Sequence, residues 1–227
     1  MGCKGDKGLF VTAKVEPGKL NALVKNLMSQ MDTTDPNEAV RRVNSGEWVV
    51  QPDPRWREMD GVIYFSVTTN GTSGSDWGSR LEKKGLRIWE WAKDVLNSPD
   101  FKPMKAGITL EIAVIRGTRF IDSDRTTKNV RAEGNRRGWK HGNDISPEIA
   151  CLIREKFTDE ELEAMGLWWI VVMHEPINDS DGDPNLLSAF RYDDGRWLDA
   201  DVDRPGYEWD DDGGFAFVIP QVAGTQH

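Results

Sequence analysis

The segment from Leu167 to Met173 (LWWIVVM) is the most hydrophobic run in the chain, and it constrains the fold more than any other feature. Its apolar residues are continuous rather than alternating, and β-branched or aromatic types dominate. This pattern predicts a strand that is buried on both faces. Pro176 has no backbone donor and ends the strand soon afterwards. The strand therefore delivers His174 and Glu175 at its C-terminal end.

Two further strand patterns, Gly61–Thr68 and Gly107–Ile115, are expected beside 167–173 at the centre of one sheet. Apolar residues at helical spacing predict helices that pack on this sheet. These helices contain Leu20–Met28, Trp77–Val95 and Ile149–Ile153. Gly85 interrupts the second helical pattern and predicts a break there.

The end of the chain is rich in strand patterns. Residues 186–192 and 197–202 flank the turn Asp193–Gly195 and predict a hairpin, and 215–220 predicts a last strand. Helices and strands alternate early, whereas strands cluster late. The sequence therefore predicts a single α+β domain with a mixed or largely antiparallel sheet, helices packed on it and a C-terminal β-meander.

A chain of 227 residues is one large domain or a domain with a modest extension. We expect residues 1–46 to form an N-terminal strand and helices packed on the main body. Residues 47–222 form the main α+β domain, and 223–227 form a tail. No apolar run approaches the ~20 residues of a membrane-spanning helix. Cys3 and Cys151 are read as free thiols, so a cytoplasmic protein without a membrane partner is expected.

The net charge of −9 is unevenly distributed. From Arg116 to Lys140 there are 8 Lys or Arg against 3 Asp or Glu, and from Glu175 to Asp212 there are 13 Asp or Glu against 3 Arg. This asymmetry predicts two electrostatic faces.

The basic region includes a predicted helix over 122–137, and its few apolar residues predict that it lies on the surface. Arg125, Lys128, Asn129 and Arg136 fall within one arc of this helix. Such a face suits phosphate contacts with nucleic acid. It equally suits a solvated surface, an acidic protein partner or pairing with the chain's own acidic region.

The acidic region contains Asp179, Asp181 and Asp183, which imitate the first three ligands of a calcium loop. Pro184 stands where such a loop requires Gly, so the full EF-hand pattern fails. Two interpretations remain open for these carboxylates. One is a looser Ca²⁺ or Mg²⁺ site that also uses Glu175, and the other is a solvated turn held by local hydrogen bonds.

His174 also has two interpretations. It is either a general base oriented by Glu175 or an aspartate, or a histidine at a strand end whose nitrogens bond backbone groups. No second histidine follows at the spacing of a zinc-protease motif. The segment NGTSGSDW, residues 70–77, suits either anion binding by backbone amides or a Ser/Asp helix cap. The ten Trp residues include exposed candidates for stacking on sugars or bases.

Four segments, WREMDGVIYFSVT, DRTTKNVRAE, MGLWWIVVMHEPINDSDGDP and DDGGFAFV, resemble a set of uncharacterised bacterial proteins. The resemblance covers roughly Val43 to Val222. It implies a bacterial, cytosolic protein and implies no activity.

Recognisable sets of residues for nucleophilic, zinc or nucleotide chemistry are missing, so the sequence favours a non-catalytic binding or accessory protein. Nucleic acid or an acidic protein would contact the basic helix. The alternative is a divalent-metal hydrolase of phosphoesters. In that case Glu175, Asp179, Asp181 and Asp183 hold Mg²⁺, Mn²⁺ or Ca²⁺, and His174 activates water.

Overall fold

The structure is a computed structural model that describes residues 23–25, 27–28, 31, 33–47, 55–204 and 206–220. The chain divides into two units, Met1–Pro54 and Arg55–His227, which are described separately. In the first unit, helix α2 (Pro36–Asn44) begins at Asp35, whose side chain accepts a hydrogen bond from Asn37 N–H at 2.9 Å. The strand expected over 8–15 and most of the helix expected over 19–31 lie outside the described residues.

The second unit is built on one mixed sheet of nine strands among the described residues. In spatial order the main path is β1 (Arg57–Met59), β2 (Val62–Thr68), β4 (Thr109–Arg116), β9 (Gly214–Ile219), β5 (Trp169–Val172), β7 (Pro184–Tyr192), β8 (Gly195–Val202) and β3 (Arg87–Ile88), while β6 (Ile177–Asn178) pairs with β7. The pairs β5–β9 and β3–β8 are parallel, and the other pairs are antiparallel. The predicted α+β class with a mixed, largely antiparallel sheet is confirmed.

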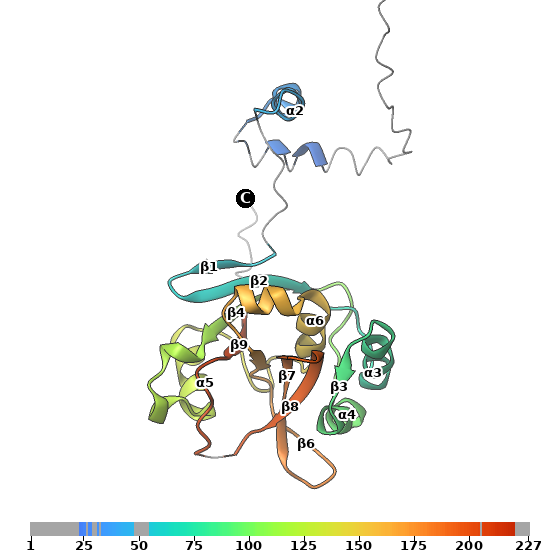
Figure 1. The fold of residues 1–227 in the computed structure, drawn as a ribbon, viewed down its shortest axis with the longest axis vertical. Coiled ribbons are helices and arrows are strands. Elements are labelled where there is room, and N and C mark those ends of the chain that lie inside the picture. The colour runs from blue at the N-terminus through green and yellow to red at the C-terminus, as the bar shows by residue number, and fades with distance from the viewer. Residues whose placement is uncertain are drawn as a thin grey trace, which may run out of the picture. The chain divides into compact units, whose positions relative to one another are not determined.

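The helices of this unit are α3 (Gly74–Lys83), α4 (Glu90–Asn97), α5 (Thr127–Arg136), α6 (Glu148–Lys156) and α7 (Asp159–Ala164). Short 3₁₀ turns cover Gly117–Arg119 and Asp122–Asp124. The predicted break at Gly85 is confirmed, because α3 ends before it and Gly85 adopts φ 77°, a value that favours glycine. The elements α3, α4 and β3 lie together at one end of the sheet, and α5 lies at the other end (Figure 1).

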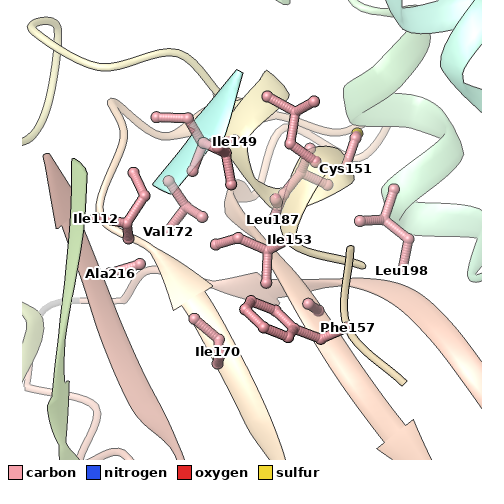
Figure 2. Packing of buried hydrophobic residues seen from close by; sticks show 14 of the residues in the cluster. Ile112, Ile149, Cys151, Ile153, Phe157, Ile170, Val172, Leu187, Leu198 and Ala216 are labelled. Carbon is pink, nitrogen blue, oxygen red and sulfur yellow. The ribbon is translucent and has the colours of Figure 1, made fainter. Parts of the chain in front are cut away.

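Alternate residues of the strands face two separate cores. In β9, Ala216 and Val218 join a core with residues of α3, α4, α6 and α7, whereas Phe215 and Phe217 face the opposite core with Val130 of α5. Figure 2 shows the first core, in which side chains of α6 pack on residues of β4, β5, β7, β8 and β9. The free thiol of Cys151 is buried there. The sheet therefore lies between two layers, and every residue of β5 is buried, as its continuous hydrophobic run predicts.

Helix α5 is a surface helix, as expected, but it begins later than residue 122 and one of its sides is buried. It begins at Thr127, and Val130 and Gly134 are fully or almost fully enclosed. A Cβ atom at Gly134 would lie 2.4 Å from Phe217 Cε1, so the missing side chain is what lets this polar helix approach the sheet.

Strand β9 corrects the expected C-terminal meander. β7 and β8 form the predicted hairpin, but β9 returns to the middle of the sheet and inserts between β4 and β5. In the described part of the chain, no helix is long and apolar enough to cross a membrane.

Candidate functional site: an aromatic and acidic face of the β7–β8 hairpin

His174 is fully buried and is held by backbone groups on both sides of its ring. Its Nδ1 lies 2.6 Å from the Glu175 carbonyl oxygen, and its Nε2 accepts the Leu187 N–H at 2.9 Å. Burial lowers the pKa of His174 to about 4, with Arg131 lowering it further against the opposing hydrogen bond to Glu175. Both ring nitrogens are occupied, so the geometry favours the structural interpretation over a general base.

The acidic loop is organised by hydrogen bonds to Asp179. Its Oδ1 accepts the N–H groups of Asp181 and Asp183, both at 3.0 Å, and its Oδ2 accepts Asn185 Nδ2 at 2.9 Å. Burial alone would raise the pKa of Asp179, but the hydrogen bond from Asn185 and the backbone N–H groups hold it below its usual value. The loop has the hydrogen-bond pattern of an Asp-centred turn.

The four carboxylates named for a metal site are not gathered at one point. Asp183 pairs with Arg204 at 3.1 Å, while Glu175 and Asp181 are exposed. In the described ranges, no three His, Cys, Asp or Glu side chains are placed to hold a metal ion.

The basic face predicted on α5 is also dispersed, and Arg125 is the main correction. It precedes the helix and is only 6% exposed. Its guanidinium donates to the Gly117 carbonyl at 3.2 Å, the Trp209 carbonyl at 2.7 Å and Asp122 Oδ1 at 2.7 Å. These bonds hold three loop segments together, and they leave Arg125 unable to contact a phosphate.

The other three basic-face residues are divided between two surface cavities, because Asn129 and Arg136 line one and Lys128 lines the other. Arg136 is exposed, but its Nη2 and Nε pair with the two carboxylate oxygens of Glu133 at 2.6 and 2.7 Å. Of the four predicted nucleic-acid contacts, Lys128 is the one cation that is both exposed and without an ion pair in the described part of the chain.

The NGTSGSDW segment does bind an anion, and the anion belongs to the protein. The buried Glu148 carboxylate accepts the Asn70 N–H at 3.2 Å and the Met104 N–H at 2.9 Å. Ser73 caps α3, as the alternative interpretation predicts. The segment is therefore a structural element.

A site that the sequence interpretation missed lies on one face of the β7–β8 hairpin. Residues paired across antiparallel strands share a face. Ser188 pairs with Asp199, Phe190 with Trp197 and Leu186 with Asp201. The helices that contact this hairpin, α4 and α6, bury their apolar residues in the opposite core. On the face that carries Ser188, several of the side chains that pack on the hairpin are aromatic.

These aromatic side chains form a continuous row, which we call the aromatic row. Trp89, at the end of β3, stacks on Trp197 with ring centroids 5.0 Å apart, and on Trp91 with centroids 6.0 Å apart. Tyr192 meets Trp197 edge-on at 5.8 Å and stacks on Phe190 at 4.2 Å. The outer member, Trp91, is 51% exposed. The row therefore presents an open aromatic ring at the surface.

Two carboxylates lie beside the aromatic row. Asp199 Oδ2 accepts the Tyr192 hydroxyl at 2.8 Å, and Asp201 Oδ2 accepts the Ser188 hydroxyl at 2.7 Å. Asp199 is buried and Asp201 is half-buried. Within the described ranges, no Lys, Arg or His side chain forms an ion pair with either carboxylate. Buried carboxylates normally have such a partner.

The pKa values of Asp199 and Asp201 are both raised, and no cationic side chain among the residues that the structure describes lowers either of them. Burial raises the pKa of Asp201 to about 7, with a further rise from the neighbouring Asp199 carboxylate and an opposing hydrogen bond from Ser188. Burial also raises the pKa of Asp199, against the hydrogen bonds from Ala200 and Tyr192. The site therefore holds negative charge at a cost that a bound cation would relieve.

A cavity of about 300 Å³, which we call the aromatic pocket, opens beside these carboxylates. Its wall consists of Trp91, Ala200, Asp201, Val202, Arg204 and Tyr207. Tyr207, like Trp91, is 51% exposed. β3 pairs with β8 only at Trp197 and Leu198, so the pocket lies where that edge of β8 continues beyond its partner.

The signal for this site is present in the hairpin itself. Asp199 and Asp201 alternate along β8 with Ala200, so both carboxylates belong to one face of the strand, the face that also carries Trp197. Trp89 and Trp91 come from the N-cap and first turn of α4, more than 100 residues earlier in the chain. Local patterns do not reveal that pairing.

Comparisons of the chain with protein-family models, curated proteins and solved structures give no match, so its function is argued from the geometry of the site.

Proposed function

We propose that the chain is a non-catalytic binding protein whose aromatic pocket takes an organic cation. The observation that carries this proposal is the juxtaposition of Asp201 with the exposed rings of Trp91 and Tyr207 in one cavity. A bacterial cytoplasmic setting, implied by the resemblance of four sequence segments, belongs to the same proposal.

The two halves of the site select the same chemistry. An organic cation gains from the negative face of an aromatic ring, especially that of Trp, and more so where water is excluded. Asp199 and Asp201 supply the negative charge, and neither has a cationic partner among the residues described. These two carboxylates would repel an anionic ligand, and a neutral ligand would leave their negative charge uncompensated.

The size of the pocket sets the class of ligand. About 300 Å³ matches the lower end of small-molecule pockets. A quaternary ammonium group or a primary amine on a short carbon chain is of that size. The proposal therefore keeps the binding role that the sequence favours, and it places the binding site at the β7–β8 hairpin instead of the basic helix.

The test is a calorimetric titration at pH 8 with tetramethylammonium and n-butylamine, using tert-butanol as the neutral analogue. We expect both cations to bind and tert-butanol not to bind. Trp91→Ala and Asp201→Asn should each weaken cation binding at least tenfold.

Matched controls separate the pocket from general effects. Trp168→Ala removes another partly exposed tryptophan, one that packs against Arg191, and Asp181→Asn removes an exposed carboxylate. Both should bind like the wild type. Equal binding of tert-butanol and tetramethylammonium, or no loss in the Asp201→Asn variant, would overturn the proposal.

A further inference from the structure

A second cavity, of about 430 Å³, adjoins the aromatic pocket, and we call it the basic cavity. Arg204 lines both. The chain passes from one to the other twice, because Val202 and Tyr207 line the aromatic pocket while Asp203 and Gly206 line the basic cavity. The two cavities are therefore neighbouring compartments with a shared wall.

The shared wall is fixed against the start of α5. Thr126 forms an antiparallel bridge with Glu208, and the Trp209 N–H donates to the Arg125 carbonyl at 2.8 Å. Trp209 Nε1 also donates to Thr127 Oγ1 at 3.0 Å. In Figure 1 the segment that follows β8 runs toward α5 before β9 begins. The spacing between the two cavities is thus set by ordered contacts.

The basic cavity is richer in cations than the aromatic pocket, whose charged lining residues are Asp201 and the shared Arg204. Lys128, Arg131 and Arg204 line it, against one carboxylate, Asp203. Arg131 Nη2 lies 3.7 Å from Asp203 Oδ2 and donates a hydrogen bond to the His174 carbonyl oxygen at 2.8 Å. Arg131 Nε is buried without a hydrogen-bond partner, and Lys128 is exposed. This donor set exceeds what the surrounding acceptors satisfy.

We infer that the ligand is a zwitterion whose cationic group occupies the aromatic pocket while a phosphate group, joined to it by a short linker, reaches the basic cavity. This inference rests on the proposed function and names its ligand class. Arginine and lysine side chains bind phosphate through charge-assisted hydrogen bonds. Lys128 and the unpartnered Arg131 Nε, beside an Arg204 that also pairs with Asp183, suit a phosphate better than they suit a singly charged carboxylate.

The experiment compares three soluble probes by calorimetry: tetramethylammonium, phosphocholine and glycine betaine. Phosphocholine should bind at least tenfold more tightly than tetramethylammonium, and betaine should fall between them. Lys128→Gln should abolish the difference between phosphocholine and tetramethylammonium. Lys83→Gln changes an exposed lysine of α3 and should preserve that difference.

The outcomes separate this inference from the proposed function. Equal affinities of the wild type for phosphocholine and tetramethylammonium, or an advantage that survives Lys128→Gln, would overturn the zwitterion and leave cation binding intact. Failure of tetramethylammonium to bind would overturn the proposed function itself. Co-sedimentation with phosphatidylcholine vesicles, measured alongside, distinguishes a lipid headgroup from a free small molecule as the source of the same chemistry.

Discussion

The imidazole of His174 accepts the backbone N–H of Leu187 at 2.9 Å and so takes the place of a strand partner on β7. β5 ends at Val172 and β6 begins at Ile177, and both pair with β7. The ring fills the interval between them. An unpaired N–H in this buried position would cost about 1–3 kcal/mol, which explains why a histidine stands at the end of the central strand.

Replacing His174 by Ala should therefore reduce stability and leave ligand binding unaffected in the fraction that remains folded. We expect a loss of about 2–4 kcal/mol from the orphaned Leu187 N–H and the cavity left behind. Urea unfolding at pH 7.5 measures this change. A stable variant that has lost cation binding would contradict the structural role.

The same histidine gives a pH dependence. Its folded pKa of about 4 lies below the ordinary value of 6.5, so the unfolded chain binds more protons between these values. Stability contributed by neutral His174 is present above pH 6.5 and is lost as the pH falls toward 4. His174→Gln should flatten this part of the stability curve, measured by urea unfolding at intervals from pH 4 to 7.

Asp201 should make the folding stability fall as the pH rises, which is opposite to the effect of His174. Its folded pKa of about 7 lies above the ordinary value of 3.8, so the folded state holds the extra proton between these values. The stability from protonated Asp201 is fully present below pH 3.8 and is lost as the pH rises to 7. Asp201→Asn should therefore unfold at a higher temperature than the wild type at pH 8, by roughly 2–6 °C, with the difference shrinking toward pH 4. A lower melting temperature for Asp201→Asn at pH 8 would show that the charge is compensated.

Arg125 and Arg136 should behave differently although the sequence places them on one basic arc. Arg125→Ala removes three hydrogen bonds and leaves the Gly117 and Trp209 carbonyls without this donor, so we expect a loss of about 2–4 kcal/mol. Arg136→Ala breaks an exposed pair with Glu133 and should cost less than about 1 kcal/mol. Denaturant unfolding of the two variants provides the comparison. Similar small effects would mean that Arg125 lies at the surface, as the arc predicts.

The sequence could predict elements whose signals are local. The continuous apolar run of 167–173 predicts the central strand, and the capping box that Thr158 and Glu161 form at the start of α7 is a local signal of the same kind. The hairpin was signalled by its Asp193–Gly195 turn. In each case the residues that determine the element lie within it, so no distant partner had to be known.

The features that local patterns missed depend on distant partners. β9 has a clear strand pattern, but its insertion between β4 and β5 requires contacts across the whole sheet. The basic arc assumed that Arg125 belongs to the exposed side of a helix, whereas Arg125 precedes α5, and the contact between Gly134 and Phe217 joins two elements more than 80 residues apart. The aromatic pocket likewise combines α4, β8 and the segment that follows β8.

A pair of glycine substitutions tests the packing of α5 directly. Gly134 and Gly78 both lie inside helices, α5 and α3, where alanine is intrinsically favoured by about 1 kcal/mol. A Cβ at Gly78 would meet its nearest neighbour, Leu96 Cδ1, at 3.9 Å, which is ordinary contact. Gly78→Ala should therefore stabilise the protein by up to about 1 kcal/mol.

Gly134→Ala should destabilise the protein, in contrast to Gly78→Ala. Its Cβ would lie 2.4 Å from Phe217 Cε1 and 2.8 Å from Cδ1, so either α5 or the buried ring must move. Overpacking of this kind costs about 1–3 kcal/mol, which outweighs the gain in helix propensity. The measurement is urea unfolding of both variants and the wild type under one condition. If Gly134→Ala were as stabilising as Gly78→Ala, α5 would not be seated on Phe217, and the contact that anchors one side of the basic cavity would have to be abandoned.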